Sequence, residues 1–455
     1  MEFGSIVFLL RFLPIFIAVY YVVPGRMKSF ILLLGSLCFY AWRVPIYVVL
    51  LLVTAVSDYC HGLLIEKYRG KRTAGIILGN ALFFDSALLL FFGYVDFLIG
   101  AINAVTGLEI SKFDFPIPLG LTIFIFQSMS YVIDVFRGNV EAQRNLISYA
   151  AFVTMFPQMP GGPIVCYRDV EQTLRIPKPE LHQISGGAKR FCIGLAKKVL
   201  LADLAGELWM GVESLGVSSL SMGTAWLGVF AFAFRMYYAY SGLADMAIGI
   251  GMCLGFSLPE SFRYPFAASS VTDFLHRWNM SLVIWVKEYV FRGNMPGRLF
   301  GAFLAWSLMG LWYGPDGTFL LWGVWLAVFY VLETIFWKRV QKALPFVVNW
   351  LLTMLVISVG WVFFALNDME SVKIYLYALF GQGAAGLLDD HFWYLLSEYL
   401  PVMSLGIVFA LPQLSMLIRC LREGRSGLSM ALYRFGEKTV PATLLLLSLL
   451  KIVGE

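Results

Sequence analysis

The feature that most constrains this chain is a series of long apolar runs that recur along most of its 455 residues. Each run has roughly the 20 residues that a helix needs to cross a bilayer. Lipid offers no hydrogen-bond partners to the backbone, so such segments must be helices, and the alternation typical of a transmembrane barrel is absent. We therefore expect an all-α, polytopic membrane bundle of about 11 spans. The spans are drawn from residues 5–23, 29–42, 45–64, 74–94, 118–136, 184–206, 222–254, 298–313, 318–337, 345–366, 396–418 and 439–453.

The composition excludes several other classes of protein. Hydrophobic residues make up 59% of the chain and charged residues 14%, whereas a soluble domain carries about 25% charged residues. This balance excludes a soluble enzyme, a disordered chain and a nucleic-acid binder. The formal net charge of +5 is ordinary for a membrane protein with basic cytoplasmic loops, so no nucleic-acid partner is expected. The first run lacks the pattern of a removed signal peptide and is predicted to be a retained span.

No pattern of metal ligands is present in the sequence. The six cysteines are scattered without a CxxC pair, and we interpret them as small packing residues. Any histidine chemistry must use one or more of four residues, which are His61, His182, His276 and His391. We therefore expect no metal centre.

The charges of the loops predict an orientation in the membrane. Basic residues concentrate in residues 67–72, 338–342 and 419–438, which the positive-inside rule places on the cytoplasmic side. Residues 207–223 and 389–398 lean acidic and are predicted to lie outside.

The segment 146–165 departs from the pattern of simple spans. It is apolar, yet it is interrupted by Pro157, Pro160, Gly161, Gly162 and Pro163. Basic residues flank it on both sides, which favours entry and exit at the cytoplasmic face. Broken backbone at membrane depth is tolerated inside protein or along a cavity. Two interpretations stay open: a re-entrant segment that lines a site, with Pro163 in its lining, or an ordinary span with a kink.

A second unusual segment covers residues 255–297 and is mixed in polarity and rich in aromatic residues. Thr272 or Asp273 is predicted to cap a helix that begins at Phe274. On one continuous helix, a polar stripe would then be formed by His276, Asn279, Val283 and Lys287. Such an amphipathic helix either plugs a cavity or lies at the membrane surface, and the pattern alone favours neither.

Ionisable residues inside membrane segments are costly and mark functional candidates. Asp245 lies deep in an apolar stretch, ten residues after Arg235. It is predicted either to pair with an arginine for structural reasons or to contact a proton or a substrate. The segment 312–316 joins two spans, and its aromatic residues are typical of anchors at a membrane face.

The ordered motifs of this chain resemble the membrane-bound O-acyltransferase family. The similarity is to its bacterial branch, which includes the membrane subunits of alginate and related polysaccharide O-acetylation and of teichoic-acid D-alanylation. The resemblance covers about residues 5–335, and the remaining spans occupy residues 345–455 of what we expect to be a single domain over residues 1–455. Its motifs are Phe12-Leu13-Pro14, Pro118-Leu119-Gly120, Phe126-Gln127-Ser128, Phe156-Pro157-Gln158, Gly161-Gly162-Pro163, Lys197-Lys198-Val199, Tyr240-Ser241-Gly242, Pro259-Glu260, Phe274 through Leu282, Gly310 through Gly314, and Leu321-Trp322-Gly323.

The resemblance implies a helical bundle around a central tunnel in a bacterial cell membrane. An activated acyl group, carried by acetyl-CoA or an acyl carrier, would enter from the cytoplasmic side and pass to a hydroxyl of a cell-surface polysaccharide. An extracytoplasmic acyltransferase partner would complete the transfer. No bound cofactor is implied.

The family's usual active site has two histidines, and this sequence departs from the pattern at both. Asn279 stands where the first histidine belongs, and Tyr313 where the second belongs. Asparagine does not titrate, and tyrosine has a pKa of about 10, far above that of histidine. His276, one predicted helical turn before Asn279, is the candidate to replace the lost base. We therefore take Tyr313, Asn279 and His276 as catalytic candidates. The candidates for substrate binding or tunnel lining are Arg277, Trp278, Ser281, Trp312, Asp316, Asp245, Pro163 and Gln127.

Three functions stay open at this point. The first is an active O-acyltransferase with altered catalytic groups. The second is a catalytically degenerate homologue that acts as a scaffold or acyl conduit in such a complex. The third, a transporter or channel of another family, is disfavoured by the ordered motifs.

Overall fold

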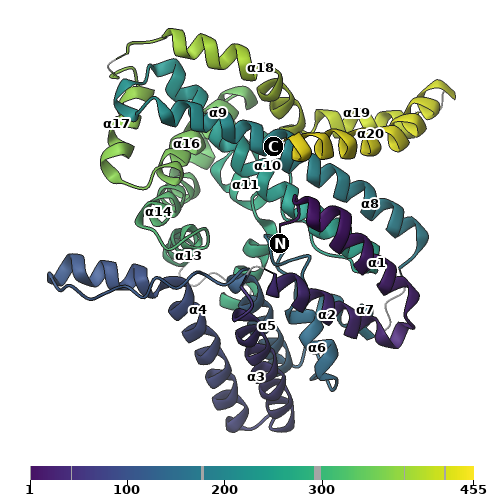
Figure 1. The fold of residues 1–455 in the computed structure, drawn as a ribbon. Helices are drawn as coiled ribbons and strands as arrows, with labels where there is room; N and C mark the ends of the chain where they lie inside the picture. The colour runs from purple at the N-terminus through teal and green to yellow at the C-terminus, as the bar shows by residue number, and fades with distance from the viewer. Residues whose placement is uncertain are drawn as a thin grey trace. The chain divides into compact units, whose positions relative to one another are not determined.

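The computed structural model describes residues 2–42, 44–175, 179–291, 299–383, 385–424 and 427–454. Within these ranges every regular element is a helix, so the all-α prediction is confirmed (Figure 1). The helices form two compact units, which are described separately. The predicted orientation rests partly on residues outside the described set, which are the side chains of Lys338, Arg339 and Lys342 and the whole of Arg425.

The first unit comprises Met1–Phe191 and Leu243–Glu260. Glycines in the left-handed region end two of its helices, because they have no Cβ to clash there: Gly107 (φ 72°) and Gly138 (φ 80°). Besides the end of α10, its elements are η1 (Phe8–Phe12), α1 (Leu13–Val22), η2 (Gly25–Met27), α2 (Lys28–Ala41), α3 (Tyr47–Lys67), α4 (Arg72–Thr106), α5 (Leu121–Arg137), α6 (Leu146–Val153), α7 (Tyr167–Arg175) and most of α8 (Leu181–Ala196).

Two clusters hold the first unit together. The rings of Phe12, Phe16 and Phe39 surround Phe156, with centroids 5.0 to 5.5 Å from its ring. Helices α3, α4 and α5 pack side by side, as Figure 1 shows. The cluster around Phe156 fixes the start of the proline- and glycine-rich stretch between α6 and α7.

The second unit comprises Cys192–Gly242 and Ser261–Glu455, and α10 continues from it into the first unit. Its core centres on Trp361, which is 1% exposed and contacts the rings of Trp278 and Trp322 at centroid distances of 5.1 and 5.7 Å. Its elements are η3 (Lys197–Ala202), α9 (Asp203–Ser214), η4 (Val217–Ser219), α10 (Met222–Leu254), η5 (Pro265–Ala267), α11 (Val271–Arg277), α12 (Met280–Trp285), η6 (Val286–Val290), α13 (Leu299–Leu311), α14 (Gly317–Leu332), η7 (Glu333–Trp337), α15 (Lys338–Ala343), α16 (Phe346–Ala365), α17 (Met369–Leu379), α18 (Asp390–Ala410), α19 (Gln413–Glu423) and α20 (Gly427–Gly454).

Five helical segments of the described residues are long and apolar enough to cross a membrane: Tyr47–Lys67, Arg72–Thr106, Gly317–Trp337, Phe346–Ala365 and Asp390–Ala410. Two shorter apolar helical segments, Phe8–Val22 and Leu299–Leu311, accompany them. At 1.5 Å per residue, α4 has about 52 Å of helix, more than the roughly 30 Å hydrocarbon core. These segments make the chain a membrane protein, while the count of about 11 spans stays a prediction.

The segment 146–165 is not one continuous helix, and apart from Leu146 and Ile147 at its start its residues are buried or partly buried. Its helical part, α6, is about 12 Å long, which is too short to cross the hydrocarbon core. Asn145 caps α6 by accepting hydrogen bonds from the backbone N–H groups of Ile147 and Ser148. The non-helical backbone that follows is buried from Thr154 to Met159. Irregular backbone of this kind is tolerated where protein surrounds it, and its re-entrant path stays a prediction.

The predicted continuous helix from Phe274 is wrong. The first helix, α11, begins at Val271 and is capped by Ser270, whose hydroxyl accepts from the Asp273 N–H. It ends at Arg277, and a new helix, α12, starts at Met280. The polar stripe predicted through Asn279 therefore does not exist, because the backbone changes direction between the two helices.

Candidate active site

Asn279 occupies the break between α11 and α12 with left-handed backbone angles (φ 46°, ψ 54°). Asparagine and histidine adopt this region more readily than most residues, because their short polar side chains relieve its cost. The break is anchored from outside, since the Met280 N–H donates to the Ser261 carbonyl at 2.7 Å. The Arg263 N–H likewise donates to the Arg277 carbonyl at 3.0 Å. The asparagine thus keeps a backbone geometry that a histidine at this position also tolerates.

The structure brings together the two positions at which this chain departs from the histidine pattern. Tyr313 lies in the turn between α13 and α14, and its hydroxyl accepts a hydrogen bond from Trp278 Nε1 at 2.6 Å. The side chain of Asn279 hydrogen-bonds the same hydroxyl. Helix α13 is held close to α14 at Gly310, where a Cβ would lie 2.1 Å from the Phe319 carbonyl oxygen. Only glycine allows this approach of α13 to α14.

Aromatic rings enclose the Tyr313 side chain. Its ring meets those of Tyr240, Trp322 and Phe364 at centroid distances of 5.5, 5.5 and 5.1 Å. Burial raises the pKa of the Tyr313 hydroxyl above its ordinary value, and the nearby Tyr240 raises it further. The hydrogen bonds from Trp278 and Asn279 oppose this increase in pKa without cancelling it. Tyr313 is therefore protonated at neutral pH and is not a general base.

The hydrogen-bond pattern leaves the Tyr313 proton available. An indole N–H can only donate, and a tyrosine hydroxyl can accept two hydrogen bonds while donating one. Ser281 Oγ donates to Asn279 Oδ1 at 3.5 Å, which leaves the amide NH₂ of Asn279 to face Tyr313. Ser281 in turn lies 3.3 Å from Ser261. Among the described residues, no acceptor is recorded for the Tyr313 O–H, so this group can donate to a bound carbonyl oxygen.

None of the described contacts of His276 is with Tyr313, Trp278 or Asn279. Its side chain is exposed, and its Nδ1 lies 2.6 Å from the Thr272 carbonyl oxygen, one turn back on α11. Its ring approaches Trp306 with centroids 6.4 Å apart. The described contacts therefore give His276 a place at the exposed side of α11, and none of them joins it to Tyr313.

Two other candidates have local structural contacts. Arg277 Nε donates to Asp273 Oδ1 at 2.7 Å within α11. Asp316 caps α14, since its Oδ1 accepts from the Thr318 N–H at 2.9 Å. No recorded contact connects Asp316 with Tyr313. Trp312 lies beside the tyrosine in the same turn and is partly buried.

The remaining candidates belong to the first unit. Asp245 accepts hydrogen bonds from Arg190 Nε and Nη2 at 2.9 and 2.8 Å, and the same guanidinium pairs with Glu260. The predicted arginine pairing is thus present, although its partner is not Arg235. An Arg between two carboxylates forms a charge-assisted hydrogen-bond network, and a contact of Asp245 with a proton or a substrate stays a prediction.

Gln127 and Pro163 lie in the interior of the first unit. Both are buried, and the side-chain amide of Gln127 donates to Gln158, which follows Pro157 in the broken stretch. No hydrogen-bond donor is recorded for Gln127 Oε1 among the described residues. Pro163 is therefore part of the buried stretch between α6 and α7, and Gln127 contacts that stretch through Gln158.

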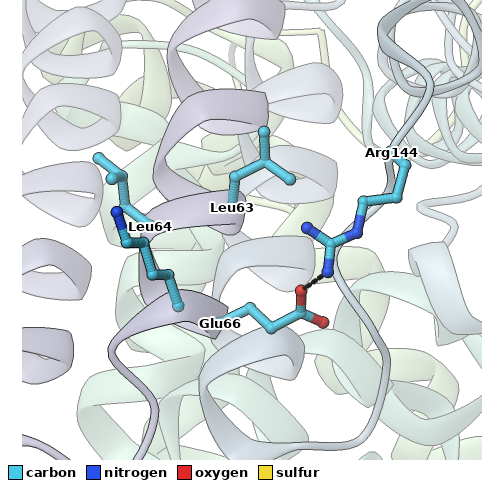
Figure 2. A pocket seen from close by; sticks show the side chains of 5 residues that line it. Leu63, Leu64, Glu66 and Arg144 are labelled. Atoms are coloured by element: carbon cyan, nitrogen blue, oxygen red, sulfur yellow. Dashed lines mark hydrogen bonds and ion pairs between the residues drawn. The ribbon is translucent and has the colours of Figure 1, made fainter.

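A surface pocket lies at the end of α3, and none of the candidate residues is in its lining (Figure 2). It is lined by Leu63, Leu64, Glu66, Lys67 and Arg144, and an ion pair joins Glu66 to Arg144. Its one acid is already paired with Arg144, and Lys67 is the other charged side chain of its lining.

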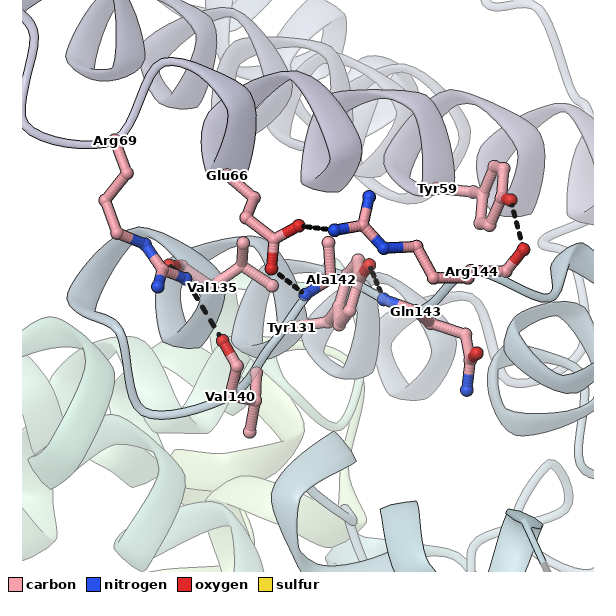
Figure 3. Close-up of polar contacts among 9 residues, drawn as sticks. All are labelled: Tyr59, Glu66, Arg69, Tyr131, Val135, Val140, Ala142, Gln143 and Arg144. Atoms are coloured by element: carbon pink, nitrogen blue, oxygen red, sulfur yellow. Dashed lines mark hydrogen bonds and ion pairs between the residues drawn. The ribbon is translucent and has the colours of Figure 1, made fainter.

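Contacts around Glu66 hold the connection between α5 and α6 against α3 (Figure 3). Glu66 Oε1 accepts from the Ala142 N–H at 2.9 Å, and the Tyr131 hydroxyl accepts from the Gln143 N–H at 3.0 Å. Arg69 donates to the Val140 carbonyl at 3.2 Å. These contacts set the start of α6 and with it the entry to the buried stretch.

Tyr240, which packs on Tyr313, was not among the residues predicted from the sequence. The buried carboxyl groups of Asp58 on α3 and Asp85 on α4 were not predicted either. The two aspartates had a detectable signal, because each stands within a predicted span where an ionisable residue is costly. Tyr240 had none beyond the Tyr240-Ser241-Gly242 motif.

The fold and the site define an all-helical membrane protein with a polar cluster enclosed by aromatic side chains. Residues 123–378 match the model of MBOAT, the membrane-bound O-acyltransferase family, and this range is more than half of the chain. The chain belongs to that family, which confirms the resemblance, and it is an acyltransferase. Within the described residues, no group of three or more potential metal ligands occurs.

Similar proteins modify bacterial polymers. The chain is 34% identical over 397 residues to the probable alginate O-acetylase AlgI of Pseudomonas syringae, which covers 84% of this chain and 76% of that protein. It is 28% identical over 428 residues to a peptidoglycan O-acetyltransferase of Helicobacter pylori, covering 85% and 81%. A teichoic acid D-alanyltransferase of Bacillus subtilis is 25% identical over 246 residues, covering 50% and 62%.

Proposed function

We propose that this protein transfers an acetyl group from a thioester donor on the cytoplasmic side to a hydroxyl of a cell-surface polysaccharide. Its family and the names of its relatives support the reaction and the class of acceptor. We place the protein in a bacterial cell membrane as a multi-pass bundle with a re-entrant segment at 146–165. Acetyl-CoA or an acyl carrier would supply the acyl group, and an extracytoplasmic acyltransferase would complete the transfer.

The observation that carries the proposed mechanism is the Tyr313 hydroxyl held by Trp278 and Asn279. Acyl transfer builds negative charge on the carbonyl oxygen of the acyl group, and a positioned O–H stabilises that charge. Tyr313 therefore acts as a hydrogen-bond donor to this oxygen, and Asn279 and Trp278 orient it. The acceptor oxygen forms the new bond to the carbonyl carbon, the carbon–sulfur bond breaks, and the acceptor's proton ends on the released thiol.

Reconstitution tests this assignment. The full chain in proteoliposomes is supplied with an acetyl donor, an acceptor polysaccharide and the partner protein, and labelled ester is counted. Tyr313→Phe should reduce transfer on the order of 10²-fold, the effect of removing one donor from an oxyanion site. Tyr377→Phe is the matched control, because Tyr377 is exposed on α17. Full activity of Tyr313→Phe would show that another group stabilises the oxyanion.

His276→Ala separates two versions of the mechanism. We expect it to retain transfer, since its imidazole is exposed and bonded to its own helix. A loss of transfer would instead make His276 the replacement base.

The degenerate alternative has one specific observation in its favour. Neither Asn279 nor Tyr313 titrates near neutral pH, so neither replaces a histidine base. Complete absence of transfer by the wild-type chain, with donor, acceptor and partner present, would favour a scaffold or acyl conduit over the enzyme.

A further inference from the structure

Two buried carboxyl groups face each other inside the first unit. Asp58 lies on α3 and Asp85 on α4, and both side chains are 0% exposed. The two carboxyl groups are within hydrogen-bonding reach of one another. All four of their oxygen atoms lack an ordinary hydrogen-bond donor among the described residues. This arrangement is independent of the acyl-transfer site in the second unit.

A hydrogen bond between two carboxyl groups requires a proton on one of them. Burial in an apolar bundle disfavours two adjacent negative charges, and a pair in this position shares a proton. Among the described residues, an imidazole, that of His61, is the one basic side chain recorded against Asp58, and no lysine or arginine is recorded against either acid. The pair therefore binds a proton in place of a positively charged side chain.

Among the described residues, the groups that α5 and α6 bring near the pair are hydroxyl groups. Ser128 of α5 approaches Asp58, and its Oγ lies 3.4 Å from the Tyr149 hydroxyl of α6. Tyr131 of α5 stacks on Tyr149 with ring centroids 4.4 Å apart. Tyr59 of α3 also packs on Tyr149, with ring centroids 6.2 Å apart. The titratable groups described near the pair on α3, α5 and α6 are thus one imidazole and three phenols, and phenols are neutral at physiological pH.

His61 connects the pair to the exposed side of α3. Its Nδ1 lies 3.8 Å from Asp58 Oδ1 and 3.3 Å from Ser57 Oγ. Its Nε2 lies 3.2 Å from Nδ2 of Asn80, which is exposed on α4. An imidazole with one nitrogen toward a buried acid and the other toward an exposed group is suited to pass protons between them. Both His61 and Asn80 lie about two turns from the basic loop at residues 67–72.

We propose that Asp58 and Asp85 form a proton-binding site within the membrane bundle, which exchanges protons with water through His61 on the side of the 67–72 loop. The ligand is a single proton shared by the two carboxyl groups. The site does not depend on the proposed acyl transfer, because it requires neither donor nor acceptor.

Infrared spectroscopy of the full chain in lipid bilayers tests this proposal. At neutral pH the wild-type protein should show a protonated carboxyl band that shifts in heavy water. The double variant Asp58→Asn/Asp85→Asn should abolish that band, because it replaces both carboxyl groups by neutral side chains of nearly the same shape. Each single variant keeps one buried carboxyl and should only shift the band. Asp390→Asn is the matched control, because Asp390 is exposed at the start of α18, and it should leave the band unchanged. His61→Gln should keep the band but slow its exchange in heavy water.

Several results would overturn the proposal. The wild-type measurement needs no variant, so absence of a protonated carboxyl band at neutral pH contradicts it even if the variants fail to fold. A band that persists unchanged in the double variant would assign the proton elsewhere. Loss of the band on replacing choline chloride with sodium chloride would make the site a sodium site. Unchanged exchange in His61→Gln would remove His61 as the entry path.

Discussion

Two substitutions at Asn279 separate the role of its backbone from that of its side chain. Asn279→Gly and Asn279→Ala both remove the side-chain hydrogen bonds with Tyr313 and Ser281, which costs about 1 kcal/mol of stability. At φ 46° alanine pays a further cost of about 1–2 kcal/mol, because its Cβ clashes in the left-handed region. Glycine has no Cβ and avoids this cost. We therefore expect the alanine variant to be less stable than the glycine variant by about 1–2 kcal/mol.

Unfolding of the detergent-solubilised variants, monitored by tryptophan fluorescence against temperature or denaturant, measures this difference. The same preparations, reconstituted with donor and acceptor, give the transfer rate at a temperature where both are folded. Because both variants lose the same contact with Tyr313, both rates should fall by a similar factor of about tenfold, equivalent to about 1.4 kcal/mol. Equal stabilities of the two variants would refute the left-handed backbone, and a fully active glycine variant would refute the role of the side chain.

Three further predictions address other parts of the structure. Burial raises the pKa of Tyr313, so its contribution to stability is constant below about pH 10 and is lost as the pH rises above it; a fall in the thermal-unfolding midpoint between about pH 6 and 9 that disappears in Tyr313→Phe would contradict this. Arg190→Met leaves Asp245 without its guanidinium and should lower stability by about 2 kcal/mol, and the double variant Arg190→Met/Asp245→Leu should recover part of the loss in thermal unfolding. Gly162→Ala places a Cβ 2.7 Å from Gln158 Cα and should sharply reduce the yield of folded protein, whereas Gly75→Ala, with open space on α4, should not; equal yields would contradict the close packing.

Much of the fold was predictable because the bilayer limits the possibilities. Apolar runs long enough to span lipid must be helical, and this rule predicted an all-helical membrane protein. The broken stretch after α6 was also predictable from the sequence, because the prolines and glycines between Pro157 and Pro163 are too closely spaced for a helix to continue. The number of spans was not predictable in the same way. Helices α8 and α10 carry charged residues, so the length of their apolar runs does not decide whether they cross the membrane.

The candidate site was predictable at its two central positions and not in its geometry. The motifs placed Asn279 and Tyr313 at the two altered positions, and the structure joins them by a hydrogen bond. The helix break was missed because its anchor, the Ser261 carbonyl, lies 19 residues before Met280 in the sequence. The partner of Asp245 was missed for a similar reason, since Arg190 lies on another helix.

The central claim is that Tyr313 donates a hydrogen bond to the acyl oxygen during transfer. The most direct measurement compares kcat and KM for the acetyl donor in wild-type and Tyr313→Phe protein, reconstituted with the partner. The account predicts that kcat falls on the order of 10²-fold while KM changes little, because the interaction forms mainly in the transition state. An unchanged kcat, with or without a change in KM, would contradict it.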